Sequence, residues 1–228
     1  DVYATTITSH VRNMCIKANC KLQDDVVATL RSMRDAEPWE PARDTLDVIL
    51  ENIRISAEEM MPACQDCGMT CVFVDIGQDV HVAGGTLVDA INRGVALGYE
   101  AGYLRKSMVA DPLRRENTGT NEPALISTRI VAGDRLRICL APKGGGAENM
   151  SKLKMLKPAD GVSGVKEFVL ETVKAAGPNP CPPIVVGVGV GGNFDQVALL
   201  AKRALLRPLG QHNPDEFYAA LESELLEE

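Results

Sequence analysis

Aromatic residues are scarce in this sequence, and an excess of positive charge is absent. Phe, Trp and Tyr make up 4% of the 228 residues, and the formal net charge at pH 7 is -7. A nucleic-acid groove needs a basic surface that follows the phosphates and aromatic rings that stack on bases. The composition therefore argues against nucleic acid as a partner. Any anionic substrate must be held by local Arg, Lys or backbone amide groups.

Long apolar runs and a targeting segment are also lacking. No apolar stretch reaches the roughly 18 residues that a membrane-spanning helix needs, and the first residues do not show the basic-then-apolar order of a signal peptide. We therefore expect no membrane association and a cytoplasmic location. Thiols stay reduced there, so the seven Cys residues favour metal binding or catalysis over a disulfide framework.

The pattern of apolar residues predicts the fold class. Hydrophobic residues make up 45% of the chain, which is enough for one large domain over residues 1–228 or for a closely joined pair of domains. Helical spacing of apolar positions predicts a helical portion over about residues 1–60. Residues 61–228 mix strand-like and helix-like runs. We expect an α/β fold of the α+β type, with a mixed β-sheet flanked by helices.

The individual elements follow from the same patterns. Strands are expected at residues 70–77, 124–131, 134–141 and 184–190, and helices at residues 86–105, 165–176, 194–206 and 214–228. Thr86 is expected to cap the helix that it begins. The Ala-Gly-Asp turn at residues 132–134 predicts a hairpin between its two flanking strands, and so an antiparallel pair within the sheet.

The first loop that could carry chemistry holds Cys64, Cys67 and Cys71. Cys71 opens a strand, and the alternation of side chains would point it away from a centre that it shared with Cys64. Not all three thiols need therefore be ligands. No His stands at a spacing that would complete a structural zinc site. On a helix face nearer the N-terminus, Cys15 and Cys20 are interpreted as packed residues.

Two further loops are rich in Gly or Pro. Residues 143–146, Lys-Gly-Gly-Gly, leave successive amides free of side-chain cover, so that an anion or inorganic sulfide can approach them. This loop lacks the Gly-Lys-Ser/Thr of a nucleotide phosphate loop. In the third loop, Cys181 stands between Pro180 and Pro182, whose fixed φ angles would orient its thiol as a ligand requires.

Residues 187–192 formally match the dinucleotide fingerprint G-x-G-x-x-G. Two of the glycines fall inside an expected strand, and Gly-Gln-His stands where the fingerprint needs an acidic residue. The alternative is that these glycines allow a strand and a helix to pack closely. At the chain's end, Glu224, Glu227 and Glu228 form an acidic helix terminus without a Gly or Asn stop, so we expect the native chain to continue.

Four separated segments, taken together, are similar to iron-sulfur hydro-lyases. They are CQDCGMTCVFVDIG, YLRKSMVADPLRRENTGTNEPA, APKGGGAENMSKLKML and NPCPPIVVGVGVGGNFDQVALLAKRALLRP. From about Ile7 onward the chain resembles the alpha subunit, or N-terminal catalytic half, of class I fumarate hydratases and L-tartrate dehydratases. The resemblance implies the reversible hydration of fumarate to (S)-malate, a step of the tricarboxylic acid cycle. Dehydration of L-tartrate is the alternative, and we favour fumarate.

The resemblance implies a 4Fe-4S cluster that is held by three Cys thiolates and leaves one iron open as a Lewis acid. By position, Cys64 and Cys181 match two of these ligands, and the third is expected beyond Glu228. Cys67 stands where the family commonly has Thr. We therefore interpret Cys67 and Cys71 as packed residues and not as ligands.

Substrate-binding residues follow from the same resemblance. Gln65 and Asp66 match positions that reach the substrate, Gln65 as a donor to a carboxylate and Asp66 as a catalytic residue that moves a proton. The alternative for Asp66 is a turn residue that accepts bonds from loop amides. Arg105 matches a carboxylate-binding arginine, a role that suits its planar fork. Gly146 matches a glycine whose backbone approaches the substrate.

The resemblance also implies a partner. A beta subunit would supply further arginines, a lysine and the base, and two alpha chains would form a homodimer within a heterotetramer. We therefore expect the chain alone to be inactive. Two other classes stay open: a cluster-bearing binding or sensing module without catalysis, and a nucleotide-binding oxidoreductase built on residues 187–192.

Overall fold

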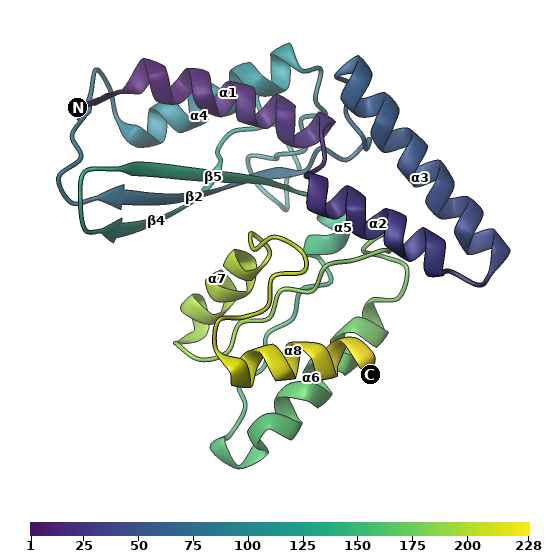
Figure 1. The fold of residues 1–228 in the computed structure, drawn as a ribbon. Helices are drawn as coiled ribbons and strands as arrows, with labels where there is room; N and C mark the ends of the chain where they lie inside the picture. The colour runs from purple at the N-terminus through teal and green to yellow at the C-terminus, as the bar shows by residue number, and fades with distance from the viewer. The chain divides into compact units, whose positions relative to one another are not determined.

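The computed structural model describes all residues from Asp1 to Glu228, which form two compact units, Asp1–Gly145 and Gly146–Glu228. Helices occur in both units, and strands occur in the first (Figure 1). A mixed sheet with helices packed on it confirms the expected α+β fold. The family resemblance implies that residues 1–228 form a single catalytic domain, and this stays a prediction.

The main sheet has three strands: β2 (Met69–Gly77), β4 (Leu125–Val131) and β5 (Leu136–Lys143). Their order is β4-β2-β5, with β2 parallel to β4 and antiparallel to β5. The central strand β2 is the most apolar of the three and is buried along most of its length, as expected for a strand with neighbours on both edges. The predicted mixed sheet is therefore confirmed.

The predicted hairpin between β4 and β5 is wrong, because β2 lies between them. The turn that joins β4 to β5 crosses the end of β2, where the amide of Gly77 donates to Arg135 O (2.8 Å) and the amide of Asp79 donates to Gly133 O (3.0 Å). A Cβ at position 77 would lie 2.3 Å from Gly133 O. Glycine at this position lets the turn pass over the strand.

Two helices, α1 (Ala4–Cys20) and α4 (Leu87–Ala101), cover one face of the sheet (Figure 1). They approach each other closely, because a Cβ at Gly98 would stand 2.7 Å from the Cβ of Cys15. Cys15 and Cys20 are fully buried, which confirms that they are packed residues. Thr86 caps α4 as predicted, since its side chain accepts a hydrogen bond from the amide of Asp89 (3.1 Å).

The helices α2 (Asp24–Ala36) and α3 (Glu40–Glu59) form an antiparallel pair with a small core of their own, made by Leu30, Leu46 and Ile53. Arg34 of α2 also binds Asp47 of α3 through Nε and Nη2, at 2.7 and 2.9 Å. The helices expected in residues 1–60 are thereby confirmed. A short parallel pair, β1 (Val2–Tyr3) and β3 (Val82–Ala83), holds the N-terminus.

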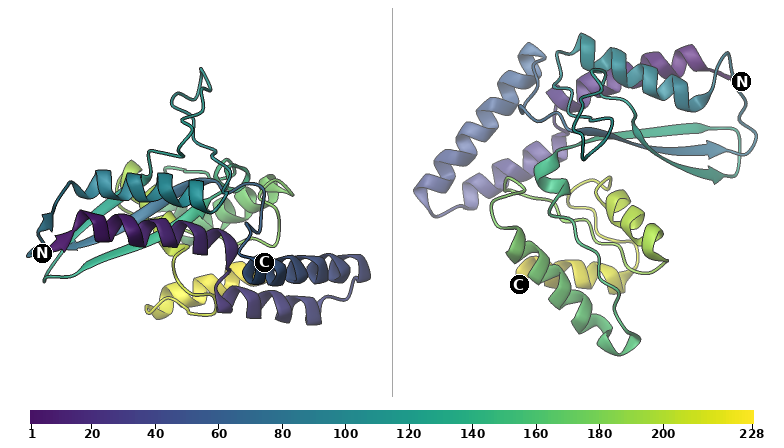
Figure 2. Two further views of the ribbon diagram at one scale, coloured as in Figure 1. Left: turned by 90° about the horizontal axis from the view of Figure 1, so that it is seen from above. Right: turned by 180° about the vertical axis from the view of Figure 1, so that it is seen from behind.

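The connection from α4 to β4, residues 102–124, extends away from the helices (Figure 2). Within it, residues 108–118 form an arm that pairs with itself. The amide of Ala110 donates to Glu116 O (2.8 Å), and that of Thr118 donates to Met108 O (3.0 Å). Leu113 at the tip of the arm is 91% exposed.

The second unit is built from helices and extended chain. Its elements are α5 (Gly145–Glu148, which begins at the last residue of the first unit), the 3-10 helix η1 (Pro158–Asp160), α6 (Gly161–Ala176), α7 (Phe194–Ala204) and α8 (Glu216–Glu227). The strand predicted at residues 184–190 is wrong: no strand forms in this segment, and it belongs to neither sheet. A strand requires a neighbour for its backbone groups, and this unit contains no strand that could serve.

No helix of the structure combines the length and apolarity that a membrane crossing requires.

Candidate functional site

The loop that carries Cys64 is anchored directly before that residue. The amide of Ala63 donates to Asn19 O (2.9 Å), and Ala63 O accepts from Nδ2 of Asn52 (2.8 Å). Cys64 itself is exposed, and its sulfur accepts a hydrogen bond from the amide of Asp66 at 3.4 Å. An accessible sulfur that receives an amide hydrogen bond is suited to ligate an iron-sulfur cluster. Its location is compatible with the predicted role.

The two neighbouring cysteines are buried, as predicted. Cys67 is 2% exposed and Cys71 is 5% exposed. The sulfur of Cys67 accepts a hydrogen bond from the amide of Arg105 (3.2 Å), and burial raises the pKa of its thiol. Since metal binding needs an accessible thiolate, Cys67 is better suited to packing and to holding the Arg105 segment than to ligation.

Both carboxylate oxygens of Asp66 are bound within the first unit. Oδ1 accepts from the amide of Gly68 (3.1 Å) and from the hydroxyl of Ser107 (3.4 Å), and Oδ2 accepts from the amide of Gly145 (3.0 Å). The alternative reading of Asp66, as a turn residue that satisfies loop amides, describes these bonds. A catalytic role for Asp66 stays a proposal.

The residues around Arg105 are held by a buried polar network that sequence reasoning missed. Asn121 is fully buried, and its Oδ1 accepts from the amides of Ser107 (2.7 Å) and Met108 (3.0 Å). Its Nδ2 donates to Gly68 O at 3.2 Å. The side chain of Arg105 is exposed and makes no hydrogen bond or ion pair within the chain, so its guanidinium is available to an anion. One short amide thus joins the Arg105 segment to the cysteine loop.

Tyr99 of α4 is a second missed member of this network. Its hydroxyl donates to Cys67 O at 2.8 Å and lies 3.2 Å from Gly68 O. Burial raises the pKa of Tyr99 to about 12. In the sequence, Tyr99 looks like any apolar position of a helix, and Asn121 looks like any polar residue of a turn. No local signal marks either of them.

The glycine run contacts both cysteine-bearing loops, each contact lying within one unit. In the first unit, a Cβ at Gly144 would lie 3.2 Å from Oδ2 of Asp66, the same oxygen that accepts from Gly145. In the second unit, a Cβ at Gly146 would lie 2.9 Å from the carbonyl oxygen of Asn179. Within each unit, the absence of a side chain on the glycine allows the close approach.

Cys181 lies in the second unit, on the loop that follows α6. It is exposed and adopts a φ of 60°, which is unusual for a residue with a side chain. Its amide donates to Pro178 O at 3.1 Å, so the loop turns tightly around this residue. The thiol of Cys181 is therefore accessible on a tightly turned loop, and its role as a ligand stays a prediction.

The glycines of residues 187–192 pack against α7. A Cβ at Gly187 would come within 2.4 Å of Ala201 O, and one at Gly189 would come within 2.4 Å of Val197 O. The interpretation that these glycines allow close packing is confirmed for the helix, although the segment that packs on it is not a strand. The dinucleotide fingerprint requires a strand that leads into a helix, and no strand forms here.

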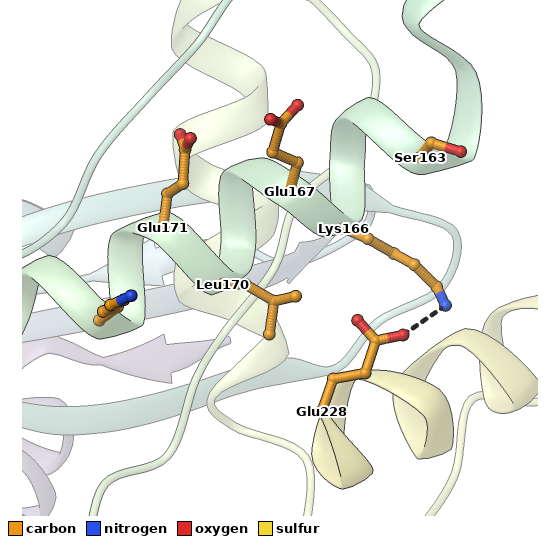
Figure 3. Close-up of a pocket in the computed structure, with 7 residues that line it drawn as sticks. Ser163, Lys166, Glu167, Leu170, Glu171 and Glu228 are labelled. Carbon is orange, nitrogen blue, oxygen red and sulfur yellow. Dashed lines mark hydrogen bonds and ion pairs between the residues drawn. The ribbon is translucent and has the colours of Figure 1, made fainter.

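Two other features bear on site assignment. A shallow hollow of about 530 Å³ lies between α6 and the end of α8, and charged side chains such as Lys166, Glu167 and Glu171 line it (Figure 3). Lys166 pairs there with Glu224 (2.7 Å) and Glu228 (3.0 Å), so a cation balances the acidic helix end. No three metal-ligating side chains cluster anywhere in the structure.

Comparison with known proteins identifies relatives over almost the whole chain. The profile of a family described as fumarate hydratase (Fumerase) matches residues 8–228. The provisionally named L(+)-tartrate dehydratase subunit alpha of Methanocaldococcus jannaschii is 44% identical over 212 residues, which cover 90% of this chain and 74% of the relative. The L(+)-tartrate dehydratase subunit alpha of Escherichia coli K12 is 30% identical over 224 residues, which cover 97% of this chain and 74% of the relative.

Proposed function

Because the chain belongs to the fumarate hydratase (Fumerase) family, a family of hydro-lyases, we propose that it is the alpha subunit of an iron-sulfur enzyme that adds water to, or removes it from, a four-carbon dicarboxylate. The observation that carries the proposal is the cysteine loop, where an exposed thiol, an amide side chain and a carboxylate follow one another at residues 64–66. The matched family and the named relatives support it along the whole chain.

Cys64 and Cys181 would hold the 4Fe-4S cluster. The donor set fits: both thiols are exposed, both stand on short loops that hydrogen bonds brace, and the two cysteines that follow Cys64 are buried. The third thiolate is expected in a segment beyond Glu228. When bound, the cluster would supply an open iron that acts as a Lewis acid on the C–O bond.

The remaining residues would bind and orient the substrate. The exposed guanidinium of Arg105 suits a bidentate bond to one carboxylate. Gln65 would donate to the other carboxylate, and its Oε1 lies 3.4 Å from the sulfur of Cys64. The backbone of Gly146 would lie along the substrate. Asp66 would move a proton at the hydroxyl group, while its present bonds to Gly68, Ser107 and Gly145 fix its direction.

Two hydroxy acids fit this residue set, L-tartrate and (S)-malate, and they differ by one hydroxyl group. The relatives that match at 44% and 30% identity carry the name of an L(+)-tartrate dehydratase subunit, which favours L-tartrate. The family description favours fumarate and (S)-malate. Discrimination between them depends on whether the site has a buried hydrogen-bond donor or acceptor for the extra hydroxyl group of L-tartrate.

A partner completes the proposed enzyme. Both relatives are named as alpha subunits, which supports a beta subunit that supplies the remaining basic residues and the base. We further propose a homodimer of alpha chains within a heterotetramer, and a cytoplasmic location. The chain alone would bind iron and not turn over.

The test is an anaerobic assay of the complete gene product, with its cluster reconstituted, alone and with the beta subunit. Formation of oxaloacetate from L-tartrate and of fumarate from (S)-malate are measured under the same conditions. We expect turnover in the complex and none in the chain alone, with a higher kcat/KM for one acid. A complex that binds iron but converts neither acid would refute the proposed reaction and favour a cluster-binding module.

A further inference from the structure

Asn121 is the one fully buried polar side chain in the connection between α4 and β4. It adopts a φ of 65°, a left-handed conformation that Asn tolerates better than most residues. Nothing in the predicted chemistry uses this residue, so its burial needs another explanation.

The hydrogen bonds of Asn121 join two segments that are far apart in the sequence. Its Oδ1 accepts hydrogen bonds from the amides of Ser107 and Met108, at 2.7 and 3.0 Å, and its Nδ2 donates to Gly68 O at 3.2 Å. The first segment begins with Arg105, and the second ends the loop that begins with Cys64. The amide of Asn121 therefore spaces these two segments at a fixed separation.

Two other contacts join the same two segments. The amide of Arg105 donates to the sulfur of Cys67 (3.2 Å), and the hydroxyl of Ser107 reaches Oδ1 of Asp66 (3.4 Å). Both contacts depend on how the Ser107 segment lies against the cysteine loop. Asn121 accepts the shortest of the hydrogen bonds that set this arrangement, at 2.7 Å from the amide of Ser107, and its side chain is fully buried.

We propose that Asn121 is a positioning residue, which holds the backbone of Arg105 against the Cys64 loop so that the guanidinium meets a carboxylate of the bound substrate. This inference rests on the proposed function for the role of Arg105. The positioning itself is a property of the chain, and it is measurable without substrate or cluster.

The structural test uses hydrogen exchange of the complete chain. Asn121→Gly removes the amide but keeps a residue at ease with positive φ. Losing a buried hydrogen bond costs about 1 kcal/mol, so the Ser107 and Met108 amides should exchange roughly fivefold faster or more. Asn92→Ala is the control, because it removes a side-chain oxygen that accepts a hydrogen bond from the backbone amide of Ala124 (2.9 Å) and should leave the exchange of Ser107 and Met108 unchanged. Unchanged exchange in Asn121→Gly would overturn the proposal.

The functional test is a double-mutant cycle in the reconstituted complex. Asn121→Gly should raise the KM of the dicarboxylate about tenfold with a smaller change in kcat, since ground-state binding through Arg105 is weakened. In an Arg105→Ala background the same substitution should have little further effect. If the effects of the two substitutions on KM multiply independently, Asn121 does not act through Arg105, and the positioning role is contradicted. If the wild-type complex converts neither acid, the proposed function fails, whereas the exchange experiment still decides the positioning.

Discussion

The amide of Gly145 donates a 3.0 Å hydrogen bond to Oδ2 of Asp66, a residue 79 positions earlier in the chain. This bond ties the glycine run to the cysteine loop. Oδ1 of Asp66 is occupied by Gly68 and Ser107. The carboxylate therefore joins three segments of the first unit, and its replacement has a structural effect that can be separated from any effect on catalysis.

Asp66→Asn should destabilise the chain by about 1–3 kcal/mol, because one oxygen becomes an NH2 group that faces an amide donor. Asp111→Asn is the matched control. Leu113 and Arg114 both donate to its Oδ1 alone (2.9 and 2.7 Å), so an amide oxygen can keep both bonds and the change should stay within about 0.5 kcal/mol. Urea unfolding of the two variants measures the difference. Equal losses would contradict the role given to Asp66.

Cys64→Ser and Cys181→Ser should each remove most of the iron bound after anaerobic reconstitution, since each removes a thiolate from the proposed donor set. Iron per chain and visible absorbance measure the effect. Cys139→Ser, in β5 and outside both loops, should bind iron as the wild type does. Full iron binding by Cys64→Ser would remove the basis for the cluster site. Chelation of iron from the wild-type complex should abolish turnover.

Stability should decline as the pH rises above 9. Burial raises the pKa of Cys15 from 9.0 to about 12 and that of Tyr99 from 10.0 to about 12. The folded state holds both protons more tightly than the unfolded chain does. Its advantage is therefore complete below pH 9 and is lost as the pH rises towards 12, at up to about 1.4 kcal/mol per pH unit for each group.

Urea unfolding at several pH values between 8 and 11 measures this decline. Cys15→Ala should be less stable at pH 8 but should lose less stability between pH 9 and pH 10. Cys181→Ser, at an exposed position, should leave the slope unchanged. A Cys15→Ala variant with the wild-type slope would show that this thiol does not contribute to the pH dependence.

Gly146→Ala should disturb the second cysteine loop, whereas Gly145→Ala should be tolerated. The new Cβ would lie 2.9 Å from Asn179 O in the first case and 4.0 Å from Oδ2 of Asp66 in the second. Overpacking of this kind costs about 1–3 kcal/mol. Hydrogen exchange in residues 176–181 should rise for Gly146→Ala only. The same exchange in both variants would mean that the loop adapts to the extra methyl group.

Much of the secondary structure could be predicted from the chain alone, because the signals for helices are local. The spacing of apolar residues marked α1, α3 and α4, and Thr86 marked where α4 begins. Helical hydrogen bonds join residues four positions apart, so a short window of sequence contains all the partners. Burial of Cys15 followed from the helical pattern and that of Cys71 from the alternation within a strand, whereas that of Cys67 followed from the family resemblance.

Tertiary structure alone decided which segments pair and which polar groups meet. The sequence contained the strands β4 and β5 but not the insertion of β2 between them, and it predicted a strand at residues 184–190 that finds no partner. Asp66 meets Ser107 and Gly145, and Asn121 meets Gly68, across 41, 79 and 53 positions. A β-ladder or a buried amide takes its partner from distant chain. The residue types of this site were therefore visible in the sequence, whereas the bonds that position them arise from packing.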